Sequence, residues 1–243
     1  MYLTIDQGNS AAKVALWEGM ELADLCVAPR LSVDVISHFL APHPRVEAAI
    51  YCSVASHGTE AVAALSNMIP RVIRLSSDLK LPIEIDYATP GTLGADRVAA
   101  AVGAWATLPG KPLLVVDAGT AVTYDAVSAD GHFLGGNIAP GMNMRLEALH
   151  RFTARLPRVQ VPREIPKDRF MGCDTPSAMI LGAVYGIVGS ISYYRSRLPE
   201  GTEVVMTGGW APELSRLVDF DVTVDPNLVS KGLNRILLYN ENI

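Results

Sequence analysis

The feature that most constrains this chain is a short acidic motif that occurs twice, each time between two predicted strands. In residues 113–124, four apolar residues precede Asp117, and a second apolar and β-branched run leads away after the turn. Near the start of the chain, the short apolar strand 2–5 leads to Asp6, and residues 13–17 alternate as its paired strand. One Asp-x-Gly alone is an ordinary turn. Its repetition predicts an internal duplication of a strand, an acidic turn and a second strand.

The residues of these two turns suit a phosphate ligand. A glycine lets the backbone come close to a ligand. A carboxylate such as Asp6 or Asp117 can hold a cation, or a cation-bound water, beside phosphate, and Thr120 adds a hydroxyl. Two such turns, roughly one domain apart, predict a cleft lined by matching halves. This arrangement resembles that of the actin, hexokinase and Hsp70 group of phosphate-handling proteins.

Length, composition and charge narrow the choice further. A chain of 243 residues, 49% hydrophobic and 19% charged, is long enough for two globular domains. The net charge of −5 and the lack of a basic cluster argue against nucleic-acid binding. We expect no transmembrane run, no export signal and no membrane partner. Cys26, Cys52 and Cys173 are scattered, which favours buried thiols in a reducing cytoplasm.

The order of patterns predicts a mixed α/β fold in two parts. The Pro/Gly-rich residues 108–112 form the best linker, so we expect domains at 1–108 and 109–243. The first half alternates strands with helices, with further strands at 22–26, 46–54 and 71–75 and helices at 32–40 and 59–68. In the second half, two glycine-containing pairs, 135–136 and 140–141, bracket a short strand, and helices follow at 142–152, 176–194, 211–218 and 228–239.

A second chemical stretch is residues 87–97, YATPGTLGADR, a Pro/Gly loop that leads into a helix near Ala95 or Asp96. In one interpretation, Asp96 is simply a first-turn acid favoured by the helix dipole and Arg97 is a surface cation. In the other, Asp96 takes a proton from a substrate hydroxyl and Arg97 grips an acidic group of that substrate. Spacing alone favours the first interpretation, because such acids are common at helix starts. The neighbouring glycines, which permit close approach, add support to the second.

Other features of the second half stay open at this stage. The helix opened by Gly141 is either ordinary or faces a phosphate with its N-terminus. The Pro-rich residues 157–167 form either an exposed loop or a flap. The helix 176–194, capped by Thr175 or Asp174, carries three glycines that allow close packing, with a subunit interface as one option: Gly182, Gly186 and Gly189. A Thr-Gly-Gly turn at 207–209 resembles the adenosine-side loop of the actin-like group.

Taken together in this order, six motifs resemble the type III pantothenate kinase family over almost the whole chain. The motifs are DQGNS at 6–10, GADR at 94–97, DAGTA at 117–121, GGNIAPG at 135–141, GCDT at 172–175 and TGG at 207–209. The resemblance implies ATP-dependent phosphorylation of the pantothenate hydroxyl, giving phosphopantothenate in the first step of coenzyme A biosynthesis. It also implies a duplicated ribonuclease H-like (actin-like ATPase) fold, with two mixed-sheet domains and a cleft between them, and a homodimer with pantothenate near the interface.

The resemblance also implies a role for each matching residue. Asp96 is the general base, and Tyr87, Gly94, Ala95, Arg97 and Thr175 contact pantothenate, with Arg97 on the carboxylate. Asp117 holds the monovalent cation, K⁺ or NH4⁺, and Asp6 lies near the Mg²⁺. The ATP phosphates are cradled by the first turn, and Thr120 also contacts ATP; the residues of that turn are Asp6, Gln7, Gly8, Asn9, Ser10, Ala11, Ala12 and Lys13.

Three positions depart from the common pattern of that family. Ala95 stands where a β-branched residue is common, Ser10 replaces threonine, and Asp174 replaces asparagine or a similar residue. None of these changes removes a catalytic group. Two rival functions remain at this stage: another actin-fold kinase for a sugar or acetate, and a non-catalytic regulator. The 87–97 stretch favours the pantothenate kinase over the first, and the intact acidic residues favour it over the second.

Overall fold

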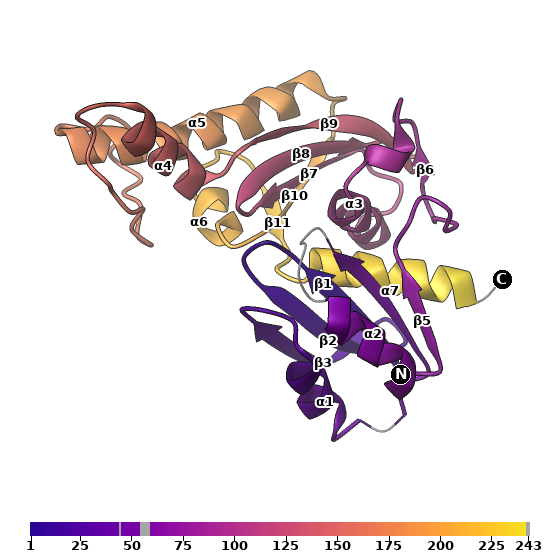
Figure 1. Ribbon diagram of the computed structural model, residues 1–243. Coiled ribbons are helices and arrows are strands. Elements are labelled where there is room, and N and C mark those ends of the chain that lie inside the picture. The colour runs from indigo at the N-terminus through magenta and orange to yellow at the C-terminus, as the bar shows by residue number, and fades with distance from the viewer. Residues whose placement is uncertain (44, 54–58, 242–243) are drawn as a thin grey trace. The chain divides into compact units, whose positions relative to one another are not determined.

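The computed structural model describes residues 1–43, 45–53 and 59–241, and the chain divides into two compact units (Figure 1). Unit 1 comprises residues 1–110, 131–133 and 227–243, and unit 2 comprises 111–130 and 134–226. The first division falls in the predicted linker, between helix α3 (Ala95–Thr107) and strand β7 (Leu113–Ala118). The C-terminal helix belongs to unit 1, a return that no local pattern in the sequence predicted. The assignment of domains to 1–108 and 109–243 stays a prediction.

Unit 1 is built on a five-stranded mixed sheet in the order β3-β2-β1-β4-β5. Strand β1 pairs antiparallel with β2 and parallel with β4, so the chain forms a hairpin and then crosses over. The strands are β1 (Tyr2–Gln7), β2 (Ala12–Glu18), β3 (Glu21–Ala28), β4 (Ala48–Ser53) and β5 (Arg71–Arg74). The predicted strand 46–54 is therefore present as β4, and its last predicted residue, Val54, lies outside the described residues.

Helices pack on this sheet as the apolar spacing requires. Helices α1 (Val33–Leu40) and α2 (Thr59–Met68) contribute Ile36, Phe39 and Leu65 to a core with the β1 residues Leu3 and Ile5. As predicted, Ser32 caps α1, since its hydroxyl accepts a hydrogen bond from the Val35 N–H at 3.2 Å.

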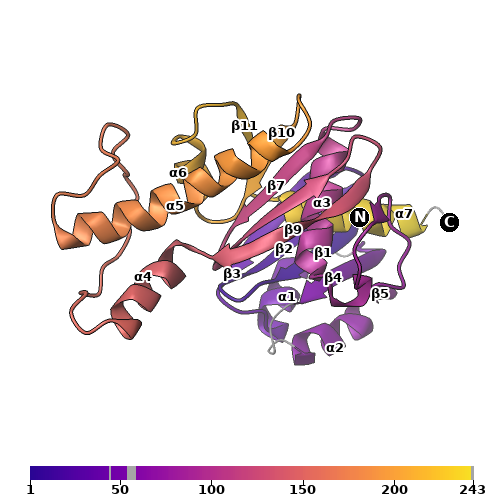
Figure 2. The same cartoon turned by 90° about the horizontal axis from the view of Figure 1, so that it is seen from above.

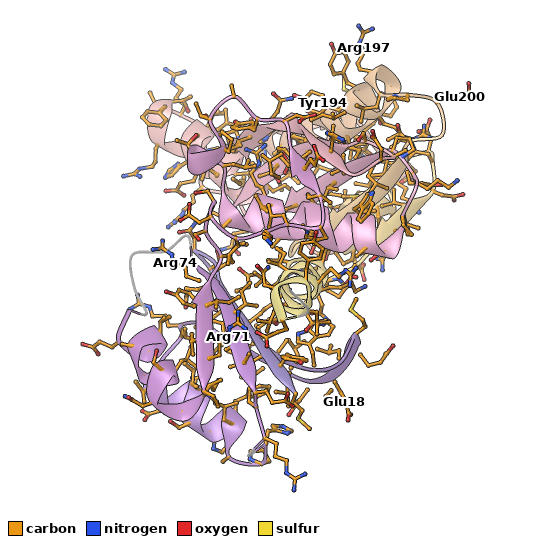
Figure 3. All side chains as sticks on the ribbon, turned by 90° about the vertical axis from the view of Figure 1, so that its right-hand side faces the viewer. Glu18, Arg71, Arg74, Tyr194, Arg197 and Glu200 are labelled. Carbon is orange, nitrogen blue, oxygen red and sulfur yellow. The ribbon has the colours of Figure 1, made fainter. Side chains whose placement is uncertain are left out.

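Helix α7 (Leu228–Glu241) contacts β1, β2 and β4 and packs closely on α3 (Ala95–Thr107). The α3–α7 crossing depends on two glycines. A Cβ on Gly232 would lie 1.8 Å from the Ala99 carbonyl oxygen, and one on Gly103 would lie 2.3 Å from that of Leu228. At the far end of α7, Glu241 forms an ion pair at 2.7 Å with Arg71, which Figure 3 labels on β5.

Unit 2 contains a second mixed sheet with the same hairpin-and-parallel pattern. Strand β7 pairs antiparallel with β8 and parallel with β10, and β10 pairs parallel with β11. The strands are β7 (Leu113–Ala118), β8 (Ala121–Val127), β9 (His132–Pro140), β10 (Glu203–Thr207) and β11 (Val222–Val224). The first residues of β9, His132 and Phe133, belong to unit 1, where they pair with β6 (Glu84–Ile85).

The long helix α5 (Thr175–Arg197) lies along the unit 2 sheet, and the short helix α6 (Ala211–Ser215) packs near β10 (Figure 2). Val184, Ile187 and Ile191 of α5 join Val116 in the core of this unit. The expectation that no segment is long and apolar enough to cross a membrane needs a correction. By length and composition alone α5 passes that test, although core helices of soluble proteins pass it too.

Several sequence predictions change in the structure. Strand β9 continues through Gly135, whose φ of +124° suits only glycine, so one long strand replaces the predicted short one. Helix α6 ends at Ser215 rather than 218. Cys52 is buried as expected, but Cys173 is exposed. Within the described chain, no atom of another element lies within 4 Å of the Cβ positions of Gly182 and Gly189, so these two glycines are not used there for close packing. A predicted interface at α5 remains a prediction.

Candidate active site

The first acidic turn places Asp6 at a meeting point of two strands. Asp6 lies opposite Lys13 in the antiparallel register with β2 and opposite Cys52 in the parallel register with β4. The Cys52 thiol, which is buried, donates to Asp6 Oδ1 at 3.9 Å. The sequence pointed to Asp6 and Lys13 but not to Cys52, because a pairing between β1 and β4 depends on the crossover between them.

The electrostatic environment of Asp6 suits a carboxylate that binds a cation. Burial is the main cause that raises the pKa of Asp6 from 3.8 to about 6, and the negative charge of Asp96 raises it further. The Lys13 ammonium and the Cys52 thiol act in the opposite direction. A buried carboxylate whose ionisation is disfavoured by burial and by a second, nearby carboxylate is a favourable position for a metal ion or a metal–phosphate complex.

The rest of the first turn divides into structural and exposed positions. Gln7 is buried; its amide donates to the Gly8 carbonyl at 3.0 Å and accepts from the Leu31 N–H at 3.2 Å. The Gly8 N–H closes the turn on the Ala11 carbonyl at 3.0 Å. Asn9 and Ser10 are exposed, whereas Ala12 is fully buried. A ligand would therefore meet the turn at Asn9, Ser10 and backbone atoms rather than at the Gln7 side chain.

Asp96 lies in the first turn of α3, where its Oδ1 accepts the Arg97 N–H at 2.9 Å. The glycine before it makes this geometry possible, because a Cβ on Gly94 would lie 2.5 Å from Asp96 Oδ1. Gly94 and Ala95 thus form the start of the helix and leave room for the carboxylate. The first-turn interpretation is correct as a description of position, and it is compatible with a chemical role.

Arg97 is not the surface cation of the simpler interpretation. It is 6% exposed, and its guanidinium lies 5.9 Å from the ring centroid of Tyr87 and 5.7 Å from that of Phe133. The two rings meet edge to face with centroids 6.1 Å apart. The structure therefore joins Tyr87 and Arg97, which the sequence had linked only by nearness, through an aromatic ring from another part of unit 1.

A cavity of about 520 Å³ in unit 1 opens beside the same helix start. It is lined by Gly94, Ala95 and apolar side chains, together with Arg74, Ser76 and Ser77. Arg74 ends strand β5 and is labelled in Figure 3. Sequence analysis missed Arg74 because a lone arginine at a strand end has no motif. Such an apolar pocket with one cation and two hydroxyls suits a small, partly apolar carboxylic acid.

The second acidic turn, in unit 2, is held by close backbone contacts. Asp117 lies opposite Thr123 on β8 and Thr207 on β10. A Cβ on Gly208, whose φ is +89°, would lie 2.5 Å from Asp117 Oδ1. The Thr-Gly-Gly turn therefore lies in close contact with the Asp117 carboxylate. This approach requires glycine at position 208, because a side chain there would clash with that carboxylate.

The start of α4 (Met142–Phe152) also meets this turn. The Gly141 N–H donates to the Thr120 carbonyl at 3.1 Å, and a Cβ on Gly141 would lie 2.4 Å from that oxygen. Thr120 is exposed. Three separate segments of unit 2, each signalled by glycine in the sequence, thus converge at one place: the Asp117 turn, Gly141 and the 207–209 turn.

At the start of α5, Asp174 rather than Thr175 is the cap. The Asp174 carboxylate accepts the Ser177 N–H at 2.7 Å, and the Asp174 N–H donates to the Ser177 hydroxyl oxygen at 3.2 Å, which completes a capping box. The Ser177 hydroxyl also donates to the Asp174 carboxylate at 2.6 Å. The Ser177 hydroxyl is the main cause that lowers the pKa of Asp174. The negative charge of Asp174 is therefore explained by its structural role as the cap of α5. Thr175 is exposed in the first turn.

Comparison with known proteins begins with the fold. A Sinorhizobium meliloti protein named for 2-dehydro-3-deoxygalactonokinase is 14% identical, with a TM-score of 0.61 and complete coverage of both chains. A Campylobacter jejuni protein that carries the name of a Baf family transcriptional activator is 25% identical, with a TM-score of 0.67 over 99% of this chain and 100% of that one. Two hairpin-bearing mixed sheets and these neighbours define the actin-like ATPase and sugar kinase fold, with its duplicated ribonuclease H-like plan.

Sequence comparison then identifies the family. The family model for type III pantothenate kinase matches residues 2–197. The type III pantothenate kinase of Porphyromonas gingivalis strain W83 is 42% identical over 98% of this chain and 98% of its own length. This chain belongs to the type III pantothenate kinase family, and it catalyses the ATP-dependent phosphorylation of pantothenate in coenzyme A biosynthesis.

Proposed function

We propose that Asp96 is the general base that accepts the proton of the pantothenate hydroxyl as the γ-phosphoryl group of ATP is transferred. The observation that carries this assignment is the helix start of α3, where Gly94 makes room for the Asp96 carboxylate beside a cavity of about 520 Å³. Phosphoryl transfer needs little covalent work from a protein, so alignment and charge do most of the catalysis. Asp96 supplies the proton acceptor in the first turn of α3, two residues after Gly94, which lines the cavity.

Two arginines support binding of the pantothenate carboxylate, and they differ in how freely they can reach it. Arg97 is buried over Tyr87 and Phe133, which fixes its direction. Arg74 is exposed at the cavity lining. We keep Arg97 as the proposed clamp, with Tyr87 as its support. Replacing Arg97 with alanine should raise the KM for pantothenate more than the KM for ATP, and equal effects would argue against the clamp. Thr175 remains a proposed substrate contact.

The first turn is the proposed cradle for the ATP phosphates. Lys13 places a cation across from Asp6, and Asn9 and Ser10 are exposed at the turn. Asp6 is the proposed partner of Mg²⁺, since a partly buried carboxylate with a raised pKa and a carboxylate neighbour fits a hard cation. When bound, Mg²⁺ would offset the negative charge of the phosphates.

The second turn is the proposed monovalent cation site, with K⁺ or NH4⁺ at Asp117 and ATP contacted by Thr120. The close packing of the turn on Gly208 and Gly141 supports this role, because it holds carbonyl and carboxylate oxygens in fixed positions. The N-terminus of α4, which begins beside Thr120, would favour a negatively charged ligand.

We further propose a cytoplasmic homodimer. An apolar groove of about 450 Å³ lies between α4 and α5, and Gly182 in its lining has open space above it. Phe152 at its edge is 85% exposed, which is unusual for a large apolar side chain. Replacing Phe152 with aspartate should convert the protein to a monomer in light-scattering measurements. An unchanged dimer would place the interface elsewhere.

The deciding experiment is phosphate transfer from ATP to pantothenate with Mg²⁺, with and without K⁺, in the wild type and in Asp117→Asn. We expect activity that needs K⁺ in the wild type and loses its K⁺ response in the variant. Activity independent of K⁺ would keep the kinase but remove the cation from Asp117. A K⁺ response that survives in Asp117→Asn would move the cation site to other residues.

A further inference from the structure

The segment 157–167, which we call the strap, covers part of unit 2 and has no role in the assignments above. Its apolar residues Val159, Val161 and Ile165 pack against the core clusters of this unit. Two of its arginines make ion pairs with helices: Arg158 with Glu147 of α4 at 3.2 Å, and Arg163 with Glu213 of α6 at 3.0 Å. A cavity of about 350 Å³ remains beneath the strap, lined by Arg158, Arg163 and Trp210 among others. The strap is thus held at a few points rather than packed throughout.

Arg163 makes more of these contacts than its surface position suggests. Besides Glu213, its Nη1 donates to the Gly209 carbonyl at 3.3 Å, and its guanidinium lies 4.8 Å from the ring centroid of Trp210. Three residues within 209–213 therefore contact the planar guanidinium of Arg163. An arginine meets such a set better than a lysine can, because it offers several donors in a fixed fork and a flat face for the ring.

The contact with Gly209 fixes one particular peptide group. The carbonyl of the 209–210 peptide points to Arg163, while its N–H, on Trp210, donates to the Ala118 carbonyl at 3.1 Å. A trans peptide places its C=O and N–H on opposite sides, so both ends of this one unit are engaged. Arg163 holds the outer end, and strand β7, one residue after Asp117, holds the inner end.

This peptide lies one residue beyond Gly208, the glycine whose Cβ position meets Asp117. Gly208 adopts a φ of +89°, and its Cβ position is 2.5 Å from Asp117 Oδ1 and 2.6 Å from the Ala118 carbonyl carbon. The turn has little freedom on its inner side, since Asp117 and Ala118 are already in contact there. Its outer side is exposed at Gly209, where Arg163 supplies a restraint.

We infer that Arg163 is a positioning residue for the nucleotide side of the active site, acting through the 207–209 turn on the Asp117 hairpin. Arg163 does not touch the reacting atoms. It keeps the 209–210 peptide in one orientation, and this orientation keeps the turn seated against Asp117 and Ala118. The inference rests on the proposed role of the second hairpin in binding ATP and its cation.

The simpler alternative is that Arg163 forms an ordinary surface ion pair. Its side chain is 73% exposed, and exposed pairs contribute little to stability. Arg158 provides the matched case: it lies on the same strap, is 75% exposed and pairs with a glutamate, Glu147. The ion pair of Arg158 ties the strap to α4. A surface role predicts equal behaviour of the two arginines, whereas positioning predicts an effect of Arg163 alone.

The test compares Arg163→Ala, Arg163→Lys, Arg158→Ala and Thr120→Ala in steady-state phosphorylation of pantothenate, with melting temperatures for all four. We expect Arg163→Ala to raise the KM for ATP by about three- to tenfold, the range for loss of a charge-assisted hydrogen bond that acts indirectly. The KM for pantothenate should stay within about twofold. Arg158→Ala should leave the KM for ATP unchanged, and Arg163→Lys should recover part of the loss. The melting temperatures of the two alanine variants of the strap should be similar.

The other outcomes overturn the inference in distinguishable ways. Equal KM values for ATP in Arg163→Ala and Arg158→Ala would reduce Arg163 to a surface ion pair. A lower KM for ATP in Arg163→Ala would mean that its guanidinium obstructs the nucleotide near Trp210. A matching rise in both KM values, or an effect restricted to kcat, would also exclude nucleotide positioning.

Thr120→Ala separates the inference from the function on which it rests. If the KM for ATP rises in Thr120→Ala but not in Arg163→Ala, the hairpin binds ATP and only the inference fails. If Thr120→Ala has no effect, the proposed ATP role of the hairpin fails. An effect of Arg163→Ala would then follow another route, and the inference would be overturned with it.

Discussion

The two acidic hairpins share one backbone plan. In each, an aspartate ends a buried strand that pairs antiparallel with the next strand and parallel with a later one. Asp6 faces Lys13 on its antiparallel side and Cys52 on its parallel side. Asp117 faces Thr123 and Thr207 at the corresponding positions. The pairing pattern is therefore repeated, although the first turn is one residue longer: Asp6 pairs with a residue seven positions ahead and Asp117 with one six positions ahead.

The first hairpin is specialised by charge. Asp6 has a cation across the hairpin, a thiol on the neighbouring strand and the Asp96 carboxylate nearby, and its pKa is raised to about 6. The second hairpin is specialised by close backbone approach. Gly208 and Gly141 bring two further segments within a Cβ's reach of the Asp117 turn. The same backbone plan thus surrounds Asp6 with charged and titratable groups in one half, and holds the Asp117 oxygens in fixed positions by close backbone contacts in the other.

The largest expected effect lies in unit 1, on the group that couples to the first hairpin. Asp96→Asn keeps the shape of the side chain but cannot accept the substrate proton, so kcat should fall by about 10²–10⁴-fold. The KM for ATP should change far less. The control is Asp86→Asn, since Asp86 pairs with His132 at 3.0 Å in the same unit and has no proposed catalytic role. Near-normal turnover in Asp96→Asn would remove Asp96 from the role of base.

The next largest effect concerns the free energy of unfolding, which is lower at neutral pH because the Asp6 carboxylate is charged in a buried position. The pKa of Asp6 in the folded protein, about 6, lies above the ordinary 3.8, so the folded state binds this proton more tightly than the unfolded state. The resulting stabilisation is complete below about pH 4 and is lost as pH rises through about 6. At pH 7, Asp6→Asn should therefore unfold with a free energy about 2–3 kcal/mol higher than the wild type, and the gain should vanish near pH 4.

Urea unfolding of the ligand-free protein at pH 7 and pH 4 measures this difference. The same variant should lose phosphorylation activity, because the amide cannot hold Mg²⁺ as the carboxylate does. Asp117→Asn is the comparison in the second half, and we expect no comparable gain in stability there. A destabilised Asp6→Asn at pH 7 would contradict the idea that burial dominates at this site.

An intermediate effect tests close backbone approach in the second hairpin. Gly208 and Gly201 both have positive φ, +89° and +79°, so an alanine at either position costs about 1 kcal/mol of backbone strain. Only Gly208 has Asp117 and Ala118 within 3 Å of its Cβ position, and nothing lies within 4 Å at Gly201. Gly208→Ala should therefore raise the KM for ATP and weaken the K⁺ response, while Gly201→Ala should lower the melting temperature alone. Equal kinetics in both variants would show that strain, not contact with Asp117, is what matters.

The sequence predicted the hairpins well because their signals are local. Alternation, apolar runs and glycine turns set the strands around Asp6 and Asp117 and the start of α3, and the structure confirms these elements. The structure also confirms that the motifs are arranged on two mixed sheets. Because the motif occurs twice, each time between two apolar runs, the sequence alone predicted the duplication.

The sequence did not predict features of the structure that depend on contacts between residues far apart in the chain. The return of α7 to unit 1 depends on the fit between Gly232 and Ala99, which no local pattern reveals. Strand β9 runs through a glycine pair because pairing overrides the local turn signal. Arg97 is buried by a ring, Phe133, from a distant part of the chain. Proposed site residues such as Arg74 and Arg163 lack motifs, and only the cavity or the contacts point to them.

The smallest effect concerns Cys52, the position that corresponds to Thr207 in the other half. The buried thiol donates to Asp6 at 3.9 Å and helps to lower the pKa of Asp6, against the larger effect of burial. A hydroxyl is a stronger donor than a thiol. Cys52→Ser should therefore lower the pKa of Asp6 by less than about one unit and leave activity nearly unchanged. Cys52→Ala removes the donor and should shift the pKa in the opposite direction. NMR titration of the Asp6 carboxyl carbon in the ligand-free protein measures both shifts. Identical titrations in the two variants would mean that burial and charge alone set the state of Asp6, and that the neighbouring strand contributes only its backbone.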